Sequence, residues 1–167
     1  KRMEGMLLNP DTSRIYMEKK RRGERRVDMR ASSNSPMGLD AVEGRDVVVL
    51  DDMIRTGATI VECCKKLKEA GARQVTFVVT HFYSSDEVKE NLNTPVIDEI
   101  VTTNTLPPIL NRDRQGRLRK KMLVLKIEKW IADFMLRRYC NGGYPEQEPK
   151  FSVDISSKNP RARPAGV

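Results

Sequence analysis

Residues 47–59 read VVVLDDMIRTGAT, and this segment constrains the fold more than any other part of the sequence. Its first four residues are a short, continuous apolar run, which is typical of a strand buried on both faces of a parallel sheet. Asp51 and Asp52 follow at once, and a turn of small residues leads to an apolar helical period that starts at Ile60. The segment therefore predicts a strand, a turn and a helix of an α/β protein.

Strand and helix signals alternate through the rest of the chain. Apolar and β-branched content predicts strands at residues 13–18, 45–50, 73–82, 98–105 and 121–127. A first helix is predicted at residues 60–70, with Ile60, Cys64 and Leu67 facing the core and Gly71 ending it. A second helix is predicted to begin at Ser84-Ser85. A third is predicted at residues 128–140, with Ile131 and Phe134 facing the core. This order predicts an α/β fold with a mostly parallel sheet and helices on both faces.

Two stretches lack apolar periodicity. Residues 19–44 carry the basic run KKRRGERR and then Ser, Asn, Pro and Gly, which predicts a long exposed loop of the kind that is usually functional. Residues 144–167 are rich in Pro and polar residues, which predicts a tail without a core of its own. We therefore expect a domain at residues 1–143, beginning with the end of a helix at residues 1–8, and a tail at residues 144–167.

The composition excludes several classes of protein. A chain of 167 residues without a run of about 20 apolar residues predicts one domain or a large part of one, and no membrane partner. Three cysteines without metal-ligand spacing argue against a disulfide framework and a zinc site, so we expect a cytoplasmic protein with Cys63 and Cys64 in its core. The net charge of +8 suits nucleic acid or a polyphosphate, but no aromatic residue lies among the basic runs, which disfavours nucleic acid.

The turn after the acidic pair has the chemistry of a sugar-phosphate site. Ligands of open α/β sheets bind at the carboxyl ends of the strands, where Asp51 and Asp52 are predicted to lie. Unpaired N–H groups at the start of the next helix suit a phosphate, and Thr56 and Thr59 add hydroxyl donors. The carboxylates can accept hydrogen bonds from sugar hydroxyls. An ordinary strand-to-helix turn with helix-capping aspartates has the same spacing, so both interpretations stay open at this point.

The same segment resembles the PRPP-binding motif of the type I phosphoribosyltransferase fold, which has four apolar residues, two acids and a Thr-Gly-x-Thr loop. Met53 and Ile54 after the acids are more similar to the ribose-phosphate pyrophosphokinase (PRPP synthetase) family than to the base-transferring enzymes. The segments YMEKKRR, VVTHFYS, IVTTNTLP and IADFMLRRYCNG also resemble that family. The resemblance covers residues 1–142 and corresponds to the C-terminal half of a synthetase, so we expect the N-terminal half to be missing.

The resemblance implies a role for each residue of the site. Asp51 would hold the ribose hydroxyls, with Asp52 beside it. The loop around the 5-phosphate of ribose 5-phosphate would consist of Arg55, Thr56, Gly57, Ala58 and Thr59. Lys19 would stabilise the ATP phosphates in the transition state with support from Arg21, because Glu18 fits the acid before the family's lysine. Lys20 and Arg22 are the alternative register.

The chain departs from the family pattern at a few points. Arg55 replaces an acid that is often found there and adds a positive charge near the phosphate. Ala58 stands where a second glycine is usual, which would cost about 1 kcal/mol if the position needs a positive φ. The loop between Lys19 and Asp51 is several residues longer than usual. His81 is expected to be structural, because one histidine makes no metal site.

The resemblance implies the activity of a ribose-phosphate diphosphokinase, in which the ribose 1-hydroxyl attacks the β-phosphorus of ATP and AMP is released. It also implies small-molecule substrates (ATP and ribose 5-phosphate), a homo-oligomer, and Mg²⁺ with ligands mainly from the absent N-terminal half and none from this chain. Three alternatives stay open. They are a PRPP-using purine or pyrimidine phosphoribosyltransferase, a non-catalytic regulatory homologue of the synthetase and a basic nucleic-acid binder.

Overall fold

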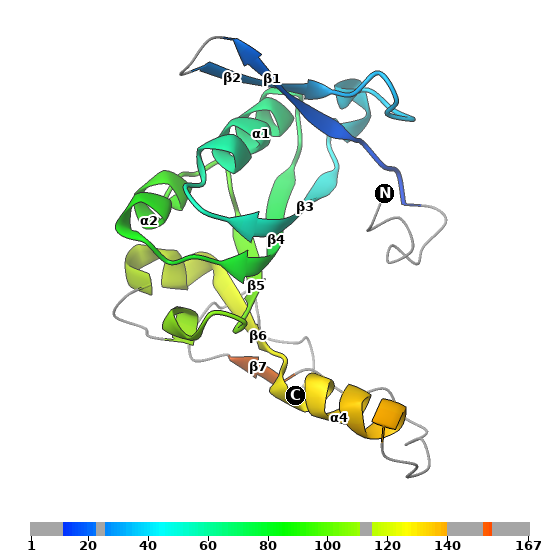
Figure 1. Ribbon diagram of the computed structural model, residues 1–167. Helices are drawn as coiled ribbons and strands as arrows, with labels where there is room; N and C mark the ends of the chain where they lie inside the picture. Colours follow the sequence, from blue (N-terminus) through cyan, green and yellow to red (C-terminus); the bar gives the residue numbers. More distant parts are fainter. Residues whose placement is uncertain (1–11, 23–25, 111–114, 140–151, 155–167) are drawn as a thin grey trace.

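The computed structural model describes residues 12–22, 26–110, 115–139 and 152–154 (Figure 1). The strands are β1 (Met17–Arg22), β2 (Arg26–Ala31), β3 (Asp46–Ile54), β4 (Gln74–Phe82), β5 (Glu99–Thr103), β6 (Met122–Lys126) and β7 (Ser152–Asp154). The α-helices are α1 (Ala58–Glu69), α2 (Asp86–Leu92) and α4 (Glu128–Tyr139). Three short 3₁₀ helices are η1 (Leu39–Val42), η2 (Pro107–Leu110) and η3 (Gly116–Lys121).

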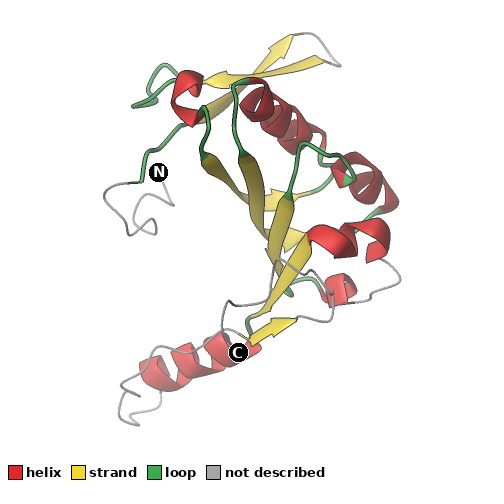
Figure 2. Cartoon of the chain, turned by 180° about the vertical axis from the view of Figure 1, so that it is seen from behind, coloured by secondary structure: helices red, strands yellow, loops and turns green. Residues whose placement is uncertain are grey.

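A five-stranded sheet forms the centre of the fold, in the order β3-β4-β5-β6-β7. Strands β3 to β6 are parallel to one another, and β7 pairs antiparallel with β6. Neighbouring parallel strands need a crossover connection, and α1, α2 and η3 lie in such connections as one layer of helices (Figures 1 and 2). The predicted α/β class with a mostly parallel sheet is confirmed.

Burial along β4 identifies the packed face of the sheet. Val75, Phe77 and Val79 are fully buried, whereas Thr76 and Val78 between them are partly exposed. Successive side chains of a strand point to opposite faces, so the buried set shares one face and joins the α1 side chains in the core. The helices in the described residues cover this one face of the sheet. The prediction that helices also cover the opposite face stays a prediction.

The inner face of α1 is the one that its sequence predicts. Ile60, Cys64 and Leu67 are all buried, and Gly71 adopts the positive φ of +89° that commonly ends a helix. The prediction that Cys63 and Cys64 are core residues is also confirmed, since both thiols are buried. Burial raises the pKa of Cys63 to about 11 and that of Cys64 to about 12, because a thiolate loses its hydration in the core.

These raised pKa values predict slow alkylation of the folded protein. At pH 8 we expect iodoacetamide to modify Cys63 and Cys64 roughly 100-fold more slowly in buffer than in concentrated urea, because only the thiolate reacts. Mass spectrometry of the peptide that contains both cysteines, sampled over time, measures the two rates. Similar rates in buffer and in urea would contradict the burial of these thiols.

An antiparallel hairpin occupies part of the segment where a long loop was predicted. β1 pairs with β2 along their length, so the loop prediction for residues 19–44 is wrong at residues 19–22 of β1 and at β2. The predicted strand at residues 13–18 overlaps only the start of β1. Arg30 links the two strands, since its Nε and Nη2 both contact Glu18 Oε1, at 2.7 and 2.6 Å. Met29 of β2 is buried in the core. The strand was not predicted, because the residues around Met29 are mostly charged and do not alternate with apolar residues in the sequence.

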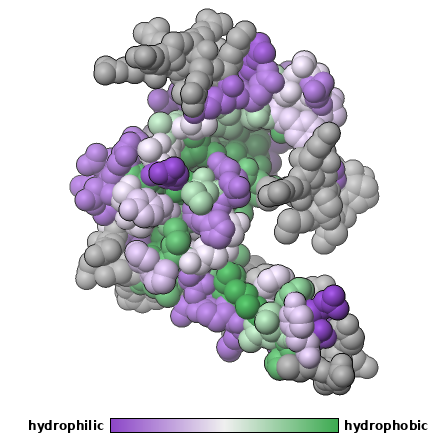
Figure 3. Space-filling model, viewed as in Figure 1, coloured by the Kyte–Doolittle hydropathy of each residue, from purple (hydrophilic) through white to green (hydrophobic). Residues whose placement is uncertain are grey.

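Helix α4 forms as predicted, but the expected orientation of its apolar face is wrong. Ile131 and Phe134 are 45% and 51% exposed, and no described residue of α4 is buried. Figure 1 shows the reason, since α4 extends away from the sheet and from the other helices. Trp130 stacks on Phe134 with ring centroids 5.8 Å apart, and the space-filling view shows apolar surface along this helix (Figure 3).

The remaining predictions concern the ends of the chain. The helix end at residues 1–8 and Cys140 lie outside the described residues. Ser152–Asp154, within the predicted tail, pair with β6 as β7, and the boundary between domain and tail stays a prediction. Among the helices in the described ranges, none is long and apolar enough to cross a membrane.

Candidate functional site

Strand β3 runs through the acidic pair and ends only at Ile54. Asp51 and Asp52 therefore lie within the strand, and the prediction that they follow its end is wrong by a few residues. The apolar run stops at Leu50, but pairing with β4 continues as far as Ile54, whose buried side chain anchors the end of the strand.

The two aspartates lie differently relative to the candidate site. Neighbouring strand residues point to opposite faces, and Asp51 lines a cavity of which Asp52 is not a lining residue. The N–H of Asp52 donates to Asp51 Oδ1 at 2.9 Å, which fixes the Asp51 carboxylate. Asp51 is thus the carboxylate that faces the candidate site.

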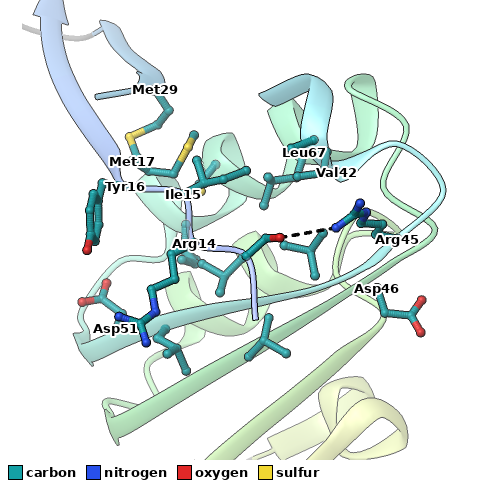
Figure 4. A pocket seen from close by; sticks show the side chains of 18 of the residues that line it. Arg14, Ile15, Tyr16, Met17, Met29, Val42, Arg45, Asp46, Asp51 and Leu67 are labelled. Atoms are coloured by element: carbon teal, nitrogen blue, oxygen red, sulfur yellow. Dashed lines mark hydrogen bonds between the residues drawn. The ribbon is translucent and has the colours of Figure 1, made fainter. Parts of the chain in front are cut away.

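The cavity lies between β3, α1 and the extended segment of residues 12–17, and has a volume of about 700 Å³. Its walls are mostly apolar, including Ile15, Val47 and Leu67, and the space-filling view shows hydrophobic surface in the hollow below the hairpin (Figure 3). Figure 4 shows the polar end of the cavity, where the Arg14 side chain points toward Asp51. The cavity also reaches Thr59 on α1, so it opens onto the turn after β3.

The turn after β3 places its one positive φ at Gly57. Gly57 has φ +84° and stands directly before α1, whose first residue is Ala58. Ala58 is helical and needs no positive φ, so the cost expected for alanine at this position does not arise. The departure from the family pattern at Ala58 is therefore compatible with the loop geometry.

The start of α1 presents unpaired donors. The first bond into the helix runs from Val61 N to Gly57 O at 3.0 Å. Within the described ranges, the N–H groups of Ala58, Thr59 and Ile60 donate no hydrogen bond. These donors and the positive end of the helix dipole can bind an anion such as a phosphate.

Burial raises the pKa of the Asp51 carboxyl above its ordinary value of 3.8, because the cavity removes water from the carboxylate. The hydrogen bond from Asp52 N acts in the opposite direction and is the smaller effect. The folded protein thus holds this proton more tightly than the unfolded chain does. The free energy of unfolding therefore falls as pH rises from below 3.8 through the raised pKa.

Replacing Asp51 by asparagine removes this pH-dependent destabilisation. We expect the Asp51→Asn variant to gain more thermal stability relative to the unmodified protein at pH 7 than at pH 3.5, because Asp51 is charged only at the higher pH. Thermal unfolding followed by circular dichroism at both pH values measures the two differences. An equal difference in Tm at the two pH values would contradict a raised Asp51 pKa.

The hairpin brings a lysine to the same helix terminus. Lys19 Nζ lies 3.3 Å from Thr59 Oγ1, although 40 residues separate the two in sequence. The hairpin is held there by Met29, which is buried in the core. Lys20, Arg21 and Arg22 belong to β1, and their side chains lie outside the described part of the structure.

The structure therefore brings together five of the predicted residues around the start of α1: Asp51, Gly57, Ala58, Thr59 and Lys19. Arg55 and Thr56 lie in the same turn with exposed side chains. Sequence patterns missed Asn91, whose Nδ2 donates to Thr56 O at 2.8 Å, and Arg14, which lines the cavity. No local signal identifies either residue, because both reach the site through tertiary packing.

His81 takes part in a network of hydroxyl groups at the carboxyl ends of β4 and β5. Its Nδ1 lies 3.0 Å from Thr105 Oγ1, and Thr105 and Thr103 both donate to Thr80 O, at 2.9 and 2.7 Å. This network ties the two strand ends together. Among the described residues, no group of three or more His, Cys, Asp or Glu side chains could hold a metal ion.

The comparisons of this chain with known proteins agree on one family. A family profile described as "Phosphoribosyl synthetase-associated domain" matches residues 11–143. A ribose-phosphate pyrophosphokinase of Haemophilus ducreyi is 46% identical over 100 residues, which cover 60% of this chain and 30% of that protein. One from Vibrio parahaemolyticus is 32% identical over 113 residues, 67% of this chain and 34% of that protein.

A solved structure agrees with these sequence matches. The crystal structure of phosphoribosylpyrophosphate synthetase from Mycobacterium smegmatis superposes with a TM-score of 0.55 at 30% identity, covering 69% of this chain and 35% of that one. The chain thus spans about a third of the length of the curated relatives that it matches.

Proposed function

Because the chain belongs to the phosphoribosyl synthetase-associated domain family, we propose that it carries the ribose 5-phosphate site of a ribose-phosphate diphosphokinase. Such an enzyme transfers the diphosphate of ATP to the 1-hydroxyl of ribose 5-phosphate and forms PRPP and AMP. We propose this activity together with its two substrates, ATP and ribose 5-phosphate, and with the roles that the resemblance implies for Asp51, for the loop at residues 55–59 and for Lys19.

One observation carries this proposal. Unpaired N–H groups at the start of α1, the carboxylate of Asp51 and the ammonium group of Lys19 converge from three elements that are distant in sequence. An anion donor set beside a carboxylate matches a phosphorylated sugar, since the phosphate needs donors and the hydroxyls need an acceptor. An ordinary strand-to-helix turn has no need for a lysine from a separate hairpin.

In the mechanism that we propose, the 5-phosphate binds the N–H groups of Ala58 and Thr59, and Asp51 accepts hydrogen bonds from ribose hydroxyls. Held at both ends, the sugar has its 1-hydroxyl directed at the ATP phosphates. Lys19 then stabilises the negative charge that develops on the transferred diphosphate. Such transfers depend mainly on positioning and on neutralisation of charge, so these residues supply the principal requirements.

The assignment of Lys19 and Arg21, in preference to Lys20 and Arg22, is supported by the hairpin. Lys19 pairs with Met29, and Lys19 Nζ approaches α1. The face of β1 that carries position 19 is thus the one next to the candidate site.

We further propose that the protein uses Mg²⁺, which in such reactions neutralises the ATP phosphates. Among the described residues no group of three or more His, Cys, Asp or Glu side chains could hold a metal ion, and no step is assigned to the metal. Its ligands would lie mainly outside this chain. We also propose a homo-oligomer that acts in the cytoplasm, where ATP and sugar phosphates are available.

The direct test is to incubate the full-length protein that contains this chain with ribose 5-phosphate, ATP and Mg²⁺ and to measure AMP by chromatography. We expect AMP to form only when both substrates are present. Absence of AMP from a folded protein would contradict the proposed activity. Binding of ribose 5-phosphate without AMP would favour the regulatory homologue, and pyrophosphate release from PRPP with a free base would favour the phosphoribosyltransferase.

A further inference from the structure

The turn that precedes α1 is held from outside by α2. Asn91, on α2, donates from Nδ2 to Thr56 O at 2.8 Å across 35 residues of sequence. In a regular α-helix, Thr56 O would instead accept from the N–H of Ile60, four residues on. Within the described residues, that bond is absent and the first helical bond is Val61 N to Gly57 O. Thr56 precedes the N-cap residue Gly57, so α1 supplies no donor to this carbonyl, and Asn91 supplies one instead.

This hydrogen bond orients the next peptide group. The peptide bond between Thr56 and Gly57 is planar and trans, so its C=O and its N–H point in opposite directions. Because Asn91 draws the Thr56 carbonyl toward α2, the Gly57 N–H points away from α2. It thereby becomes a further donor beside the unpaired N–H groups of Ala58 and Thr59.

Asn91 is well placed to fix a geometry, because α2 is itself fixed. Val88 and Leu92 of α2 are fully buried, and Ser85 caps the helix by accepting from Val88 N at 3.2 Å. Asn91 and Leu92 also pack directly against Gly57, since a Cβ built on Gly57 would lie 3.5 Å from Asn91 Cβ and 3.3 Å from Leu92 Cδ2. The contact between turn and helix thus combines packing and a directed hydrogen bond.

We propose that Asn91 is a positioning residue of the phosphate loop: by binding Thr56 O it aims the Gly57 N–H at the 5-phosphate of ribose 5-phosphate. The role rests on the proposed function for the identity of the ligand. It adds a fourth element, α2, to a site formed by β3, α1 and the hairpin. Asn91 itself touches the loop backbone and not the substrate.

The test compares three variants by ¹⁵N–¹H spectra during titration with ribose 5-phosphate, with the Gly57 amide as the signal. Asn91→Ala removes the donor, and we expect roughly tenfold weaker binding and a smaller Gly57 shift, as for a lost hydrogen bond near a charged group. Asn93→Ala is the matched control, because Asn93 is exposed just past the end of α2 and lacks a side-chain hydrogen bond in the described residues. We expect this control to bind like the unmodified protein.

Asn91→Asp supplies a readout that a purely structural role would not change. A protonated aspartate can donate to Thr56 O, whereas an ionised one cannot. We therefore expect the affinity of Asn91→Asp, relative to the unmodified protein at each pH, to be lower at pH 7 than at about pH 3.5, because an aspartate is mostly protonated only below its ordinary pKa of about 3.9. Thermal unfolding at both pH values identifies any loss that comes from unfolding alone.

The outcomes separate this inference from the proposed function. Unchanged ribose 5-phosphate affinity in Asn91→Ala would overturn the role of Asn91, even if the protein forms AMP. A Gly57 response that depends on Asn91, in a protein that forms no AMP, would support the role while the diphosphokinase activity fails. A protein whose Gly57 amide does not respond to ribose 5-phosphate at all would overturn both.

Discussion

Replacing Gly57 by alanine is expected to weaken ribose 5-phosphate binding by roughly 10- to 100-fold, the equivalent of one hydrogen bond to a charged group. Gly57 has φ +84°, which costs about 1–2 kcal/mol for any residue with a Cβ. The new Cβ would also lie 3.3 Å from Leu92 Cδ2, which is a tight contact, and 3.5 Å from Asn91 and Ile54, which is ordinary contact. The turn can relieve both effects only by moving the donors that bind the phosphate.

Gly44→Ala is the matched control for this substitution. Gly44 also has a positive φ, of +68°, but a Cβ there would meet nothing within 4 Å, and Gly44 lies outside the site. We expect both variants to lose stability, and only Gly57→Ala to lose affinity. Thermal unfolding and calorimetric titration with ribose 5-phosphate measure the two effects. Equal affinities in the two variants would contradict the placement of the phosphate at this turn.

Replacing Lys19 by alanine is expected to lower the rate of AMP formation by roughly 100- to 1000-fold, as does the loss of one group that stabilises charge in the transition state. The KM for ribose 5-phosphate should change little, because Lys19 is assigned to the ATP phosphates and not to the sugar. Steady-state kinetics of AMP release with each substrate varied in turn separates these two effects.

Two further lysine variants make this expectation specific. Lys65→Ala removes the same charge from an exposed position within α1 and should leave the rate close to that of the unmodified protein. Lys20→Ala tests the other register of the hairpin. A large loss of activity in Lys20→Ala together with near-normal activity in Lys19→Ala would contradict the assignment of Lys19.

The central part of the fold could be predicted because its signals are local. β3, α1 and β4 are encoded by continuous apolar runs and by one amphipathic period, and their order requires a parallel sheet. The predicted end of β3 was too early, because an apolar run does not reveal that pairing with β4 carries the strand through Asp51 and Asp52 to Ile54.

The features that escaped prediction depend on tertiary contacts. The hairpin contains mostly charged residues, so its strand pairing and the burial of Met29 become evident only in the folded protein. Asn91 has an ordinary position on a short helix, and its contact with Thr56 exists only because α2 docks beside the turn. The pattern of α4 predicted an apolar stripe correctly but could not reveal that Ile131 and Phe134 face outward.

A crystal structure of the protein with ribose 5-phosphate tests the central claim most directly. We predict the 5-phosphate at about 2.7–3.1 Å from the backbone nitrogens of Gly57, Ala58 and Thr59, with ribose hydroxyls donating to the Asp51 carboxylate. A phosphate bound elsewhere, with these N–H groups facing solvent, would contradict the assignment of this turn as the ribose 5-phosphate site.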